Sequence, residues 1–384
     1  MTYREFVKSG LSPRMLGQAI AEMTGGERIR EVVMSPDAFA HRTSEASIAE
    51  QVGEVLEQNG LPRPVPADDD RVGGWQLMYQ MLENDEWLIA DNCRELIEDP
   101  AIDAVAIATP VTTHYELALS ALRGGKHVLV EKPLAVNTDQ VQQLIDVAQK
   151  SNRVLMVDHT FVYSGAVRKI RELVESGGLG EIYYYDSVRI NLGLFQHDVN
   201  VLWDLAVHDL SIMDYVLSFR PCAVSAAGLS HVPGGTENIA YLTLFFEGSQ
   251  IAHIHANWLA PVKLRRTLIG ASRKMIVYDD LDQSEKIKVY DKGITLNNHH
   301  NPERLYEILV GYRTGDMLAP QIDTTEALHR EIKHFLDCID NQQEPETGGG
   351  AGLRVVEILQ AASQSMIQRG RPIELRLASL KATA

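Results

Sequence analysis

The chain has few cysteines, a deficit of basic side chains and no long apolar run. Its 3 cysteines, Cys93, Cys222 and Cys338, match no disulfide or metal-binding spacing, so we expect them to be reduced in a cytoplasmic protein. The 36 Lys and Arg residues against 52 Asp and Glu residues give a net charge of -16, which disfavours nucleic acid or an anionic membrane as a partner. No run of about twenty apolar residues occurs and the start has no signal-peptide pattern, so we expect neither a membrane span nor export.

The clearest local pattern lies in the second quarter of the chain. Short apolar runs at 104–108 and 128–130 predict strands that are buried on both faces. Between them, Thr112 or Thr113 can cap a helix. A strand, a helix and a second strand this close together predict a parallel βαβ unit with a right-handed crossover.

Polar residues follow both predicted strands at the edge where open parallel sheets bind ligands. Thr109-Pro110 follows the first strand and Glu131-Lys132-Pro133 follows the second. A lysine that ends a buried strand is costly unless it faces a cleft, a partner or water. Spacing alone leaves open whether Lys132 binds a ligand or is simply solvated.

These motifs resemble those of the glucose–fructose oxidoreductase/inositol dehydrogenase/rhizopine-catabolism (Gfo/Idh/MocA) family. The resemblance rests on Thr109-Pro110-x-x-x-His114 and on the Glu-Lys-Pro triplet within residues 125–135. It implies a two-domain, nicotinamide-dependent oxidoreductase acting on sugars or polyols, in which Lys132 contacts the substrate hydroxyl beside the nicotinamide. The cofactor contacts that it implies here are Thr109, Pro110, His114, Glu131 and Lys132.

The start of the chain lacks the glycine fingerprint expected of such a protein. A dinucleotide-binding domain usually opens with a buried strand and Gly-x-Gly-x-x-Gly at a helix N-terminus, where backbone amides bind the pyrophosphate. Residues 4–20 contain only Gly10 and Gly17, at a wider spacing. We assign phosphate contacts to Gly10, Ser12 and Arg14, and the alternative is an ordinary turn before a helix.

The residues after a strand predicted at 30–34 bear on the choice of cofactor. An acidic residue at the end of this strand binds the ribose hydroxyls of NAD. Ser35 stands there, with Asp37 two places on and Arg42 nearby. Ser35 with Arg42 would suit NADP, whereas Asp37 would suit NAD. From the habit of the family we favour NAD and keep NADP as the alternative.

The chain is long enough for two domains, since 384 residues with 45% hydrophobic content can bury two cores. We place a Rossmann-like dinucleotide-binding domain at 1–157, with an insertion at about 43–86 that is a lid or a subunit contact. Strand-like runs between 181 and 290 predict a second, α+β domain at 158–384 with a large, mostly antiparallel open sheet. An uncovered sheet face would expose apolar surface, so we expect a homodimer or homotetramer formed through this sheet.

Asp204 and His208 are four residues apart in a predicted helix and therefore share a face. A carboxylate beside an imidazole favours the protonated ring and orients it, as a general acid/base near neutral pH requires. The alternative is a surface ion pair. An Asp-x-x-x-His at this place is the second signature of the family, and residues 191–209 look most like its nucleotide-sugar branch.

Other candidates are weaker, because each is equally plausible as a surface residue. Six side chains are candidates for the substrate pocket: Tyr163, Arg168, Arg189, Asn191, His197 and Asn200. Arg168 and Arg189 would suit a diphosphate, because guanidinium binds phosphate bidentately. His253-x-His255 could bind zinc, but no third ligand accompanies it, so we predict no metal.

The resemblance and these residues together predict reversible hydride transfer between nicotinamide and a secondary alcohol of a sugar, nucleotide sugar or polyol. His208 would transfer the hydroxyl proton, Lys132 would hydrogen-bond the oxygen, and Asp204 would orient them. One alternative is NAD-assisted oxidation that enables elimination on a glycoside. The other, suggested by the missing glycines, is a non-enzymatic sugar-binding or regulatory protein that has lost its cofactor.

Overall fold

The computed structural model divides the chain into two compact units, Met1–Ile89 and Ala90–Ala384, called here the first and second units. The residues that the structure describes are 18, 20–21, 32–34, 48–66, 93–193, 199–291, 293–296 and 310–375. The domain boundary predicted at 157/158 falls inside the second unit, and the division into domains 1–157 and 158–384 stays a prediction.

The first unit contains a parallel strand pair connected by a helix. Its described elements are β1 (Val32–Met34), α2 (Ile48–Gln58) and β2 (Pro64–Pro66). β1 and β2 pair in parallel, and β1 confirms the strand predicted at 30–34. The buried side chains Ala49, Val52 and Leu56 of α2 recur at helical spacing, so they form one apolar face of that helix.

The second unit begins with a three-stranded parallel sheet of Rossmann type, which confirms the predicted βαβ unit. Its elements are α4 (Cys93–Glu98), β3 (Ala104–Ile107), α5 (Val111–Arg123), β4 (His127–Glu131), α6 (Thr138–Ser151) and β5 (Leu155–Asp158). The strands lie in the order β3-β4-β5, and Val128, Val130 and Val157 are fully buried. Because the strands are parallel, the residues that follow them lie at one edge of the sheet.

The start of α5 differs from the prediction. Neither Thr112 nor Thr113 is the N-cap, because the helix begins at Val111 and Pro110 occupies the cap position without a side-chain hydrogen bond. The Thr113 hydroxyl instead donates to the Pro110 carbonyl oxygen at 2.8 Å. Proline is tolerated at a helix start because its φ is already restricted and no N–H is left without an acceptor.

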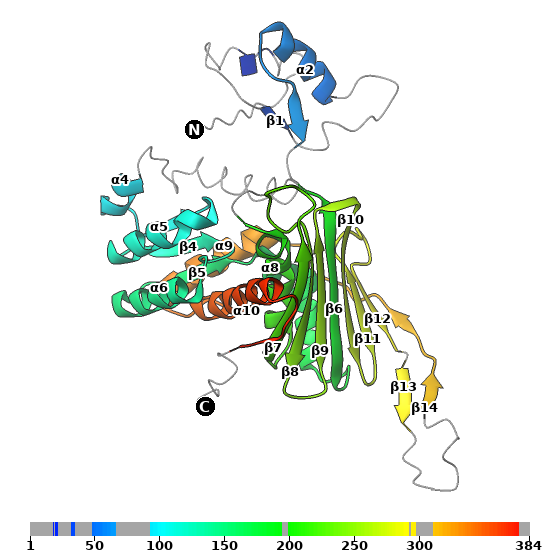
Figure 1. The fold of residues 1–384 in the computed structure, drawn as a ribbon. Coiled ribbons are helices and arrows are strands. Elements are labelled where there is room, and N and C mark those ends of the chain that lie inside the picture. The colour runs from blue at the N-terminus through cyan, green and yellow to red at the C-terminus, as the bar shows by residue number, and fades with distance from the viewer. Residues whose placement is uncertain are drawn as a thin grey trace, which may run out of the picture. The chain divides into compact units, whose positions relative to one another are not determined.

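A nine-stranded, mostly antiparallel sheet follows, as predicted for the C-terminal part (Figure 1). Its strands are β6 (Ile182–Leu192), β7 (Pro221–Leu229), β8 (Ile239–Phe246), β9 (Ile251–Asn257), β10 (Leu259–Ala271), β11 (Met275–Asp279), β12 (Ile287–Tyr290), β15 (Met317–Leu318) and β16 (Ile373–Glu374). They lie in the order β15-β12-β11-β10-β6-β9-β8-β7-β16, and only β6 and β9 pair in parallel among them. A separate hairpin pairs β13 (Gly293–Leu296) with β14 (Val310–Arg313).

Helices cover one face of the large sheet. They are the 3-10 turn η2 (Thr160–Tyr163), α7 (Gly165–Glu175), the π-helical turn η3 (Leu202–Ala206), α8 (Val207–Val216) and α10 (Gly349–Ile367), whereas α9 (Ala327–Asn341) packs against η2. Along β8 every second side chain is buried, because alternate residues of a strand face opposite sides of the sheet. The covered face therefore contributes the core of this part of the unit.

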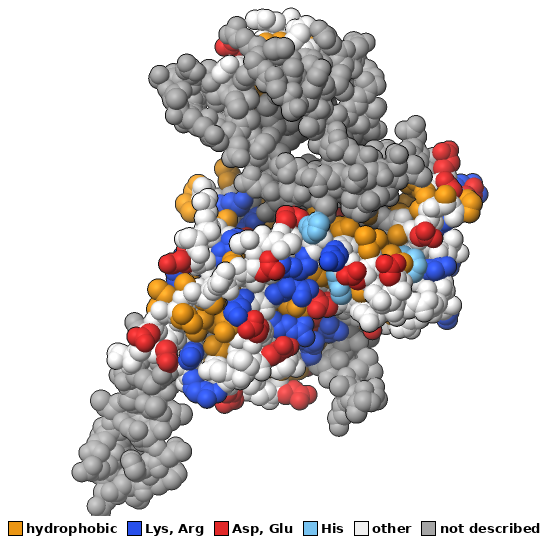
Figure 2. All heavy atoms as spheres, turned by 180° about the vertical axis from the view of Figure 1, so that it is seen from behind, with side chains coloured by type: hydrophobic (Ala, Val, Ile, Leu, Met, Phe, Trp, Pro, Cys, Tyr) orange, Lys and Arg blue, Asp and Glu red, His pale blue; other side chains and the backbone are white. Residues whose placement is uncertain are grey.

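Charged side chains are unevenly distributed despite the net charge of -16. On the face shown in Figure 2, Lys and Arg side chains gather among acidic ones near the middle of the visible surface of the second unit. Ion pairs also connect helices that are distant in sequence, such as Arg354 of α10 with Asp214 of α8 at 2.8 Å. Local basic character is thus compatible with an acidic chain.

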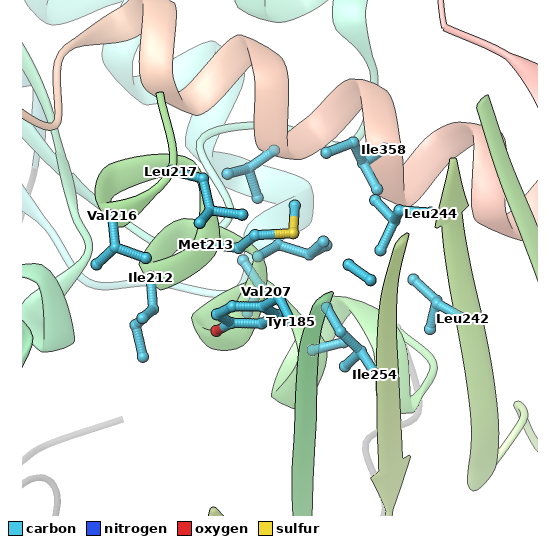
Figure 3. Close-up of a cluster of buried hydrophobic side chains, with 14 of the residues drawn as sticks. Tyr185, Val207, Ile212, Met213, Val216, Leu217, Leu242, Leu244, Ile254 and Ile358 are labelled. Carbon is cyan, nitrogen blue, oxygen red and sulfur yellow. The ribbon is translucent and has the colours of Figure 1, made fainter. Parts of the chain in front are cut away.

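The main core lies between the sheet, α8 and α10 (Figure 3). Tyr185 of β6, Leu244 of β8 and Ile254 of β9 face Met213 of α8 and Ile358 of α10, and all five are almost fully buried. Burying such side chains contributes roughly 1.5–3 kcal/mol each. This packing holds α8 against the sheet.

α10 connects the cores of the two sheets, because Leu353 and Val356 pack with the parallel sheet whereas Val355 and Leu359 pack with the large one. Gly349 is the first residue of α10, and a Cβ there would lie 2.6 Å from Cγ1 of Ile145. The missing side chain allows close packing of α10 on α6.

Candidate active site

The two strand-end turns of the parallel sheet are connected by a buried histidine. His114 of α5 is 1% exposed. Its Nδ1 lies 2.8 Å from the Pro133 carbonyl oxygen and its Nε2 lies 2.7 Å from the Thr109 carbonyl oxygen. Burial lowers the pKa of His114, against the effect of these two carbonyls. His114 therefore holds the turns at the ends of β3 and β4 together, while Thr109 and Pro110 remain exposed.

Lys132 extends from the end of β4 to the turn before α8. Its Nζ donates to the Asp204 carbonyl oxygen at 3.0 Å and to Asp204 Oδ1 at 3.2 Å. The two side chains are only 18% and 24% exposed. The neighbouring Glu131 is also partly buried. Residues 72 positions apart in the chain thus meet at the strand-end edge.

Asp204 is held by a second partner from the large sheet. Its Oδ2 accepts a hydrogen bond of 3.0 Å from the indole Nε1 of Trp258. Trp258 lies between β9 and β10 and is 1% exposed. With Lys132 on one carboxylate oxygen and Trp258 on the other, Asp204 has a defined orientation.

The predicted pairing of Asp204 with His208 is wrong. Asp204 lies in the π-helical turn η3, and its side chain binds Lys132 and Trp258 instead. The i→i+5 hydrogen bonding of such a turn widens it, so residues four apart no longer stack directly. His208 Nδ1 is enclosed and has no hydrogen-bond partner among the described residues.

The protonation of His208 also differs from the prediction. Burial lowers its pKa well below 6.5, and the positive charges of Lys132, Arg189 and Arg265 add to this effect. The ring of Phe161 packs edge-on against it, with the ring centroids 5.0 Å apart. The imidazole is therefore uncharged near neutral pH, and Nε2 is the nitrogen left to contact a ligand.

Arg189 lies in a buried ion pair rather than in an open pocket. Its Nε donates to Asp209 Oδ2 at 2.7 Å, and the two side chains are 4% and 3% exposed. Ser187 donates to the other Asp209 oxygen at 2.5 Å. The guanidinium stacks over Phe161, 4.4 Å from the ring centroid. Arg189 thus supports the helix that carries His208 and has no surface available for the predicted substrate contact.

Tyr163 and Arg168 are likewise bound within the protein. Tyr163 is fully buried, and its hydroxyl lies 2.9 Å from the hydroxyl of Thr347. Arg168 donates to Glu346 at 2.5 Å and lies over the Tyr163 ring. The structure therefore does not bring these two predicted substrate contacts to the edge occupied by Lys132.

The remaining predicted residues fall into three groups. The Asn200 Oδ1 accepts from the backbone N–H of Leu202 at 3.1 Å and so caps the helical segment. Asn191 is partly buried near the end of β6. Outside the described residues lie Gly10, Ser12, Arg14, Ser35, Asp37 and His197.

Sequence reasoning missed Trp258 and Asp209. A tryptophan directly after a buried strand is a useful signal, because a buried indole N–H needs an acceptor. Asp209 pairs with Arg189, which lies on the same face of β6 as the buried Tyr185 and Ser187, and no sequence pattern marked this pair. Both residues position groups at the site.

No group of three or more metal-binding side chains occurs among the described residues. His255 of the predicted His-x-His pair stacks on Tyr241, with the ring centroids 4.3 Å apart.

Within the described part of the chain, none of the helices combines the length and apolar character needed to cross a membrane.

Two family profiles match the chain. The profile described as "Oxidoreductase family, NAD-binding Rossmann fold" (GFO_IDH_MocA) matches residues 80–159. The profile described as "GFO/IDH/MocA C-terminal domain" matches residues 167–277. Together they include the parallel sheet, η3, α8 and most of the large sheet.

Known proteins with similar sequences and structures include named dehydrogenases. UDP-N-acetylglucosamine 3-dehydrogenase of Acidithiobacillus ferrooxidans is 27% identical over 70% of this chain and 81% of its own length. The NAD(+)-dependent scyllo-inositol 2-dehydrogenase of Bacillus subtilis is 23% identical over 73% of this chain and 80% of its own. A crystal structure of a putative oxidoreductase from Magnetospirillum magnetotacticum has a TM-score of 0.61 and 26% identity, covering 78% of this chain and 90% of that one.

Proposed function

Because this chain belongs to the Gfo/Idh/MocA family of NAD-binding oxidoreductases, we propose that its catalytic groups are Lys132 and His208, assisted by Asp204. The chain is an NAD(P)-dependent oxidoreductase that acts on a secondary alcohol of a sugar, nucleotide sugar or polyol. The single observation that supports this site most strongly is the contact of Lys132 with Asp204, one turn before His208.

The strand-end edge fits a nicotinamide cofactor and an alcohol. It combines an exposed turn at Thr109, the ammonium group of Lys132 and the uncharged imidazole of His208. When bound, NAD supplies the hydride acceptor or donor. We assign cofactor contacts in the second unit to Thr109, Pro110, Glu131 and Lys132, with His114 acting through the turns that it connects. In the first unit we assign them to Gly10, Ser12, Arg14, Ser35 and Asp37.

The side chains divide the remaining chemistry among them. In the oxidising direction, Nε2 of His208 accepts the hydroxyl proton as a hydride leaves the carbinol carbon. Lys132 donates a hydrogen bond to the same oxygen and stabilises its developing negative charge. Asp204, held by Trp258, orients Lys132. In the reducing direction, protonated His208 returns the proton to the oxygen.

The experiment is to measure NAD and NADP binding and then screen nucleotide sugars, free sugars and polyols for NAD(P)H formation. Lys132→Met and His208→Gln should each lower kcat/KM by roughly 10²-fold or more, with little change in cofactor binding for His208→Gln. Lys150→Met and His329→Gln are matched controls, because both residues are exposed on helices and neither belongs to the assigned site. Normal turnover by both active-site variants would refute the assignment.

The relatives suggest two substrate classes, nucleotide sugars and polyols. UDP-N-acetylglucosamine 3-dehydrogenase and scyllo-inositol 2-dehydrogenase are both relatives, so the first screen should compare nucleotide sugars with polyols. Among the predicted pocket residues, we keep Asn191 and His197 as substrate contacts. Asn191→Ala should raise KM with a smaller effect on kcat if that contact binds substrate in the ground state.

We also propose a homodimer or homotetramer that forms through the uncovered face of the large sheet. Tyr241, Phe245 and Ile251 are 42%, 36% and 45% exposed, and Phe245 pairs directly with Ile251 across β8 and β9. Exposed apolar side chains side by side on a sheet favour association. Sedimentation of the wild type and of Phe245→Lys tests this, since the variant should dissociate.

A cytoplasmic location, expected from three unpaired cysteines, stays a prediction.

A further inference from the structure

A second polar cavity lies in the second unit, bounded by α7, α8 and the start of α10. Its volume is about 490 Å³, which is within the range of small-molecule pockets. The lining side chains that matter here are His159, Arg171, Asp214, Arg220, Glu346 and Arg354. Lys132, Asp204 and His208 are not among the residues that line it. The cavity thus shares none of these three residues, while His159 follows β5 at the same sheet edge.

Three guanidinium groups and three carboxylates line this cavity: Arg171, Arg220 and Arg354 with Glu175, Asp214 and Glu346. Asp214 accepts two bonds of 2.8 Å from Arg354 and also contacts Arg220 at 3.3 Å. Arg171 pairs with Glu175 at 2.7 Å. Glu346 pairs with Arg168, which approaches from outside the lining. Four arginines thus share three carboxylates: Arg168, Arg171, Arg220 and Arg354 share Asp214, Glu175 and Glu346.

Repulsion within this cluster is evident at Arg220. Burial lowers the pKa of its guanidinium, and nearby Arg354 and Arg171 lower it further against the opposing effect of Asp214. Arg220 and Arg171 are 39% and 38% exposed, so an entering ligand can reach both. An anion placed between them would offset the repulsion.

His159 gives an independent indication of a ligand. It lines the cavity and is 1% exposed, yet neither ring nitrogen has a hydrogen-bond partner among the described residues. Buried polar atoms nearly always have a partner in native proteins. A polar ligand in the cavity would supply one.

We propose that this cavity binds a small molecule carrying a phosphate group, with Arg171 and Arg220 binding the phosphate and His159 hydrogen-bonding the rest. Guanidinium favours phosphate because the two match in charge and geometry. A cavity of about 490 Å³ also accommodates a body the size of a monosaccharide.

This location would connect the ligand to the helix of the proposed active site. Ser211 lines the cavity, and its hydroxyl donates to the His208 carbonyl oxygen at 2.8 Å. Residues three apart on α8 share a face. The binding test below does not depend on the assignment of His208, because it measures no turnover.

The experiment is isothermal titration calorimetry of the full chain with inorganic phosphate and glucose 6-phosphate, at constant ionic strength, both with and without saturating NADH. Glucose and chloride are the uncharged and simple-anion controls. We expect 1:1 binding of glucose 6-phosphate that falls by about 10-fold or more in Arg171→Gln and in Arg220→Gln. Lys169→Gln is the matched control on α7, because Lys169 pairs with Glu172 and does not line the cavity.

Two results would overturn the proposal. One is the absence of phosphate-dependent binding at millimolar concentration. The other is binding that NADH abolishes and that both arginine variants retain, since this would place the anion in the cofactor site. If either variant is poorly folded, a crystal structure of the wild type with glucose 6-phosphate decides: density at Arg171 and Arg220 supports the proposal, and density elsewhere refutes it.

Discussion

The buried pair of Arg189 and Asp209 gives the sharpest test of how this site is built. Arg189→Met removes the guanidinium and leaves the buried Asp209, whose side chain is 3% exposed, without its cation. Ser187 still donates a hydrogen bond to Asp209 Oδ1. Loss of one partner from a buried ion pair typically costs about 3–5 kcal/mol, because the remaining charge is uncompensated. We therefore expect the free energy of unfolding to fall by about that amount.

The assay is equilibrium unfolding in urea, with the midpoint followed by tryptophan fluorescence and by circular dichroism. Arg266→Met is the matched control, because Arg266 pairs with Asp279 at 2.7 Å but is 50% exposed. Such a surface pair contributes about 0–1 kcal/mol. If Arg189→Met and Arg266→Met lose equally little stability while Arg189→Met raises KM, then Arg189 is a substrate contact and the structural role is refuted.

Three further predictions follow from the site. Trp258→Phe removes one hydrogen bond to Asp204, which is worth about 1.5–3 kcal/mol for a charged acceptor. We therefore expect kcat to fall roughly 10–100-fold while KM changes little. Equal changes in kcat and KM would argue against a role of Trp258 in positioning Asp204. The pKa of His159 is about 4 in the folded chain against 6.5 in the unfolded chain. The unfolded state therefore binds more protons below pH 6.5, and the free energy of unfolding should fall by roughly 3 kcal/mol between pH 6.5 and pH 4. Urea midpoints of the wild type and of His159→Phe across this pH range test this, and the same pH dependence of the midpoint in both proteins would contradict it. Because the pKa of His208 is lowered, the acid limb of kcat/KM for alcohol oxidation should lie below pH 6.5, and a limb centred above that value would contradict an uncharged base.

Much of the fold could be predicted because the relevant signals are local. The apolar runs at β3 and β4 are bounded by turn residues, and alternation along β8 separates buried from exposed positions. One error concerns a helix start: Pro110, and not Thr112 or Thr113, occupies the cap position of α5.

The candidate site was only partly predictable. Lys132 follows a recognisable strand, so its place at the sheet edge follows from the parallel topology. The partners of the Asp204 carboxylate could not be predicted in this way. Helical spacing favoured His208, whereas the π-helical turn directs the carboxylate to Lys132 and Trp258. Burial of Arg189 was equally invisible, since a single arginine on a strand is usually solvated.

The sequence by itself determined the strand and helix pattern, the motif around Lys132 and the order of the two sheets, because these depend on the spacing of neighbouring residues. Only the tertiary structure decided that Trp258 holds Asp204, that His208 is uncharged and that the arginines near α8 surround a cavity. Each of these depends on groups brought together from distant parts of the chain, whose burial and mutual charge arise only when the helices pack on the sheet.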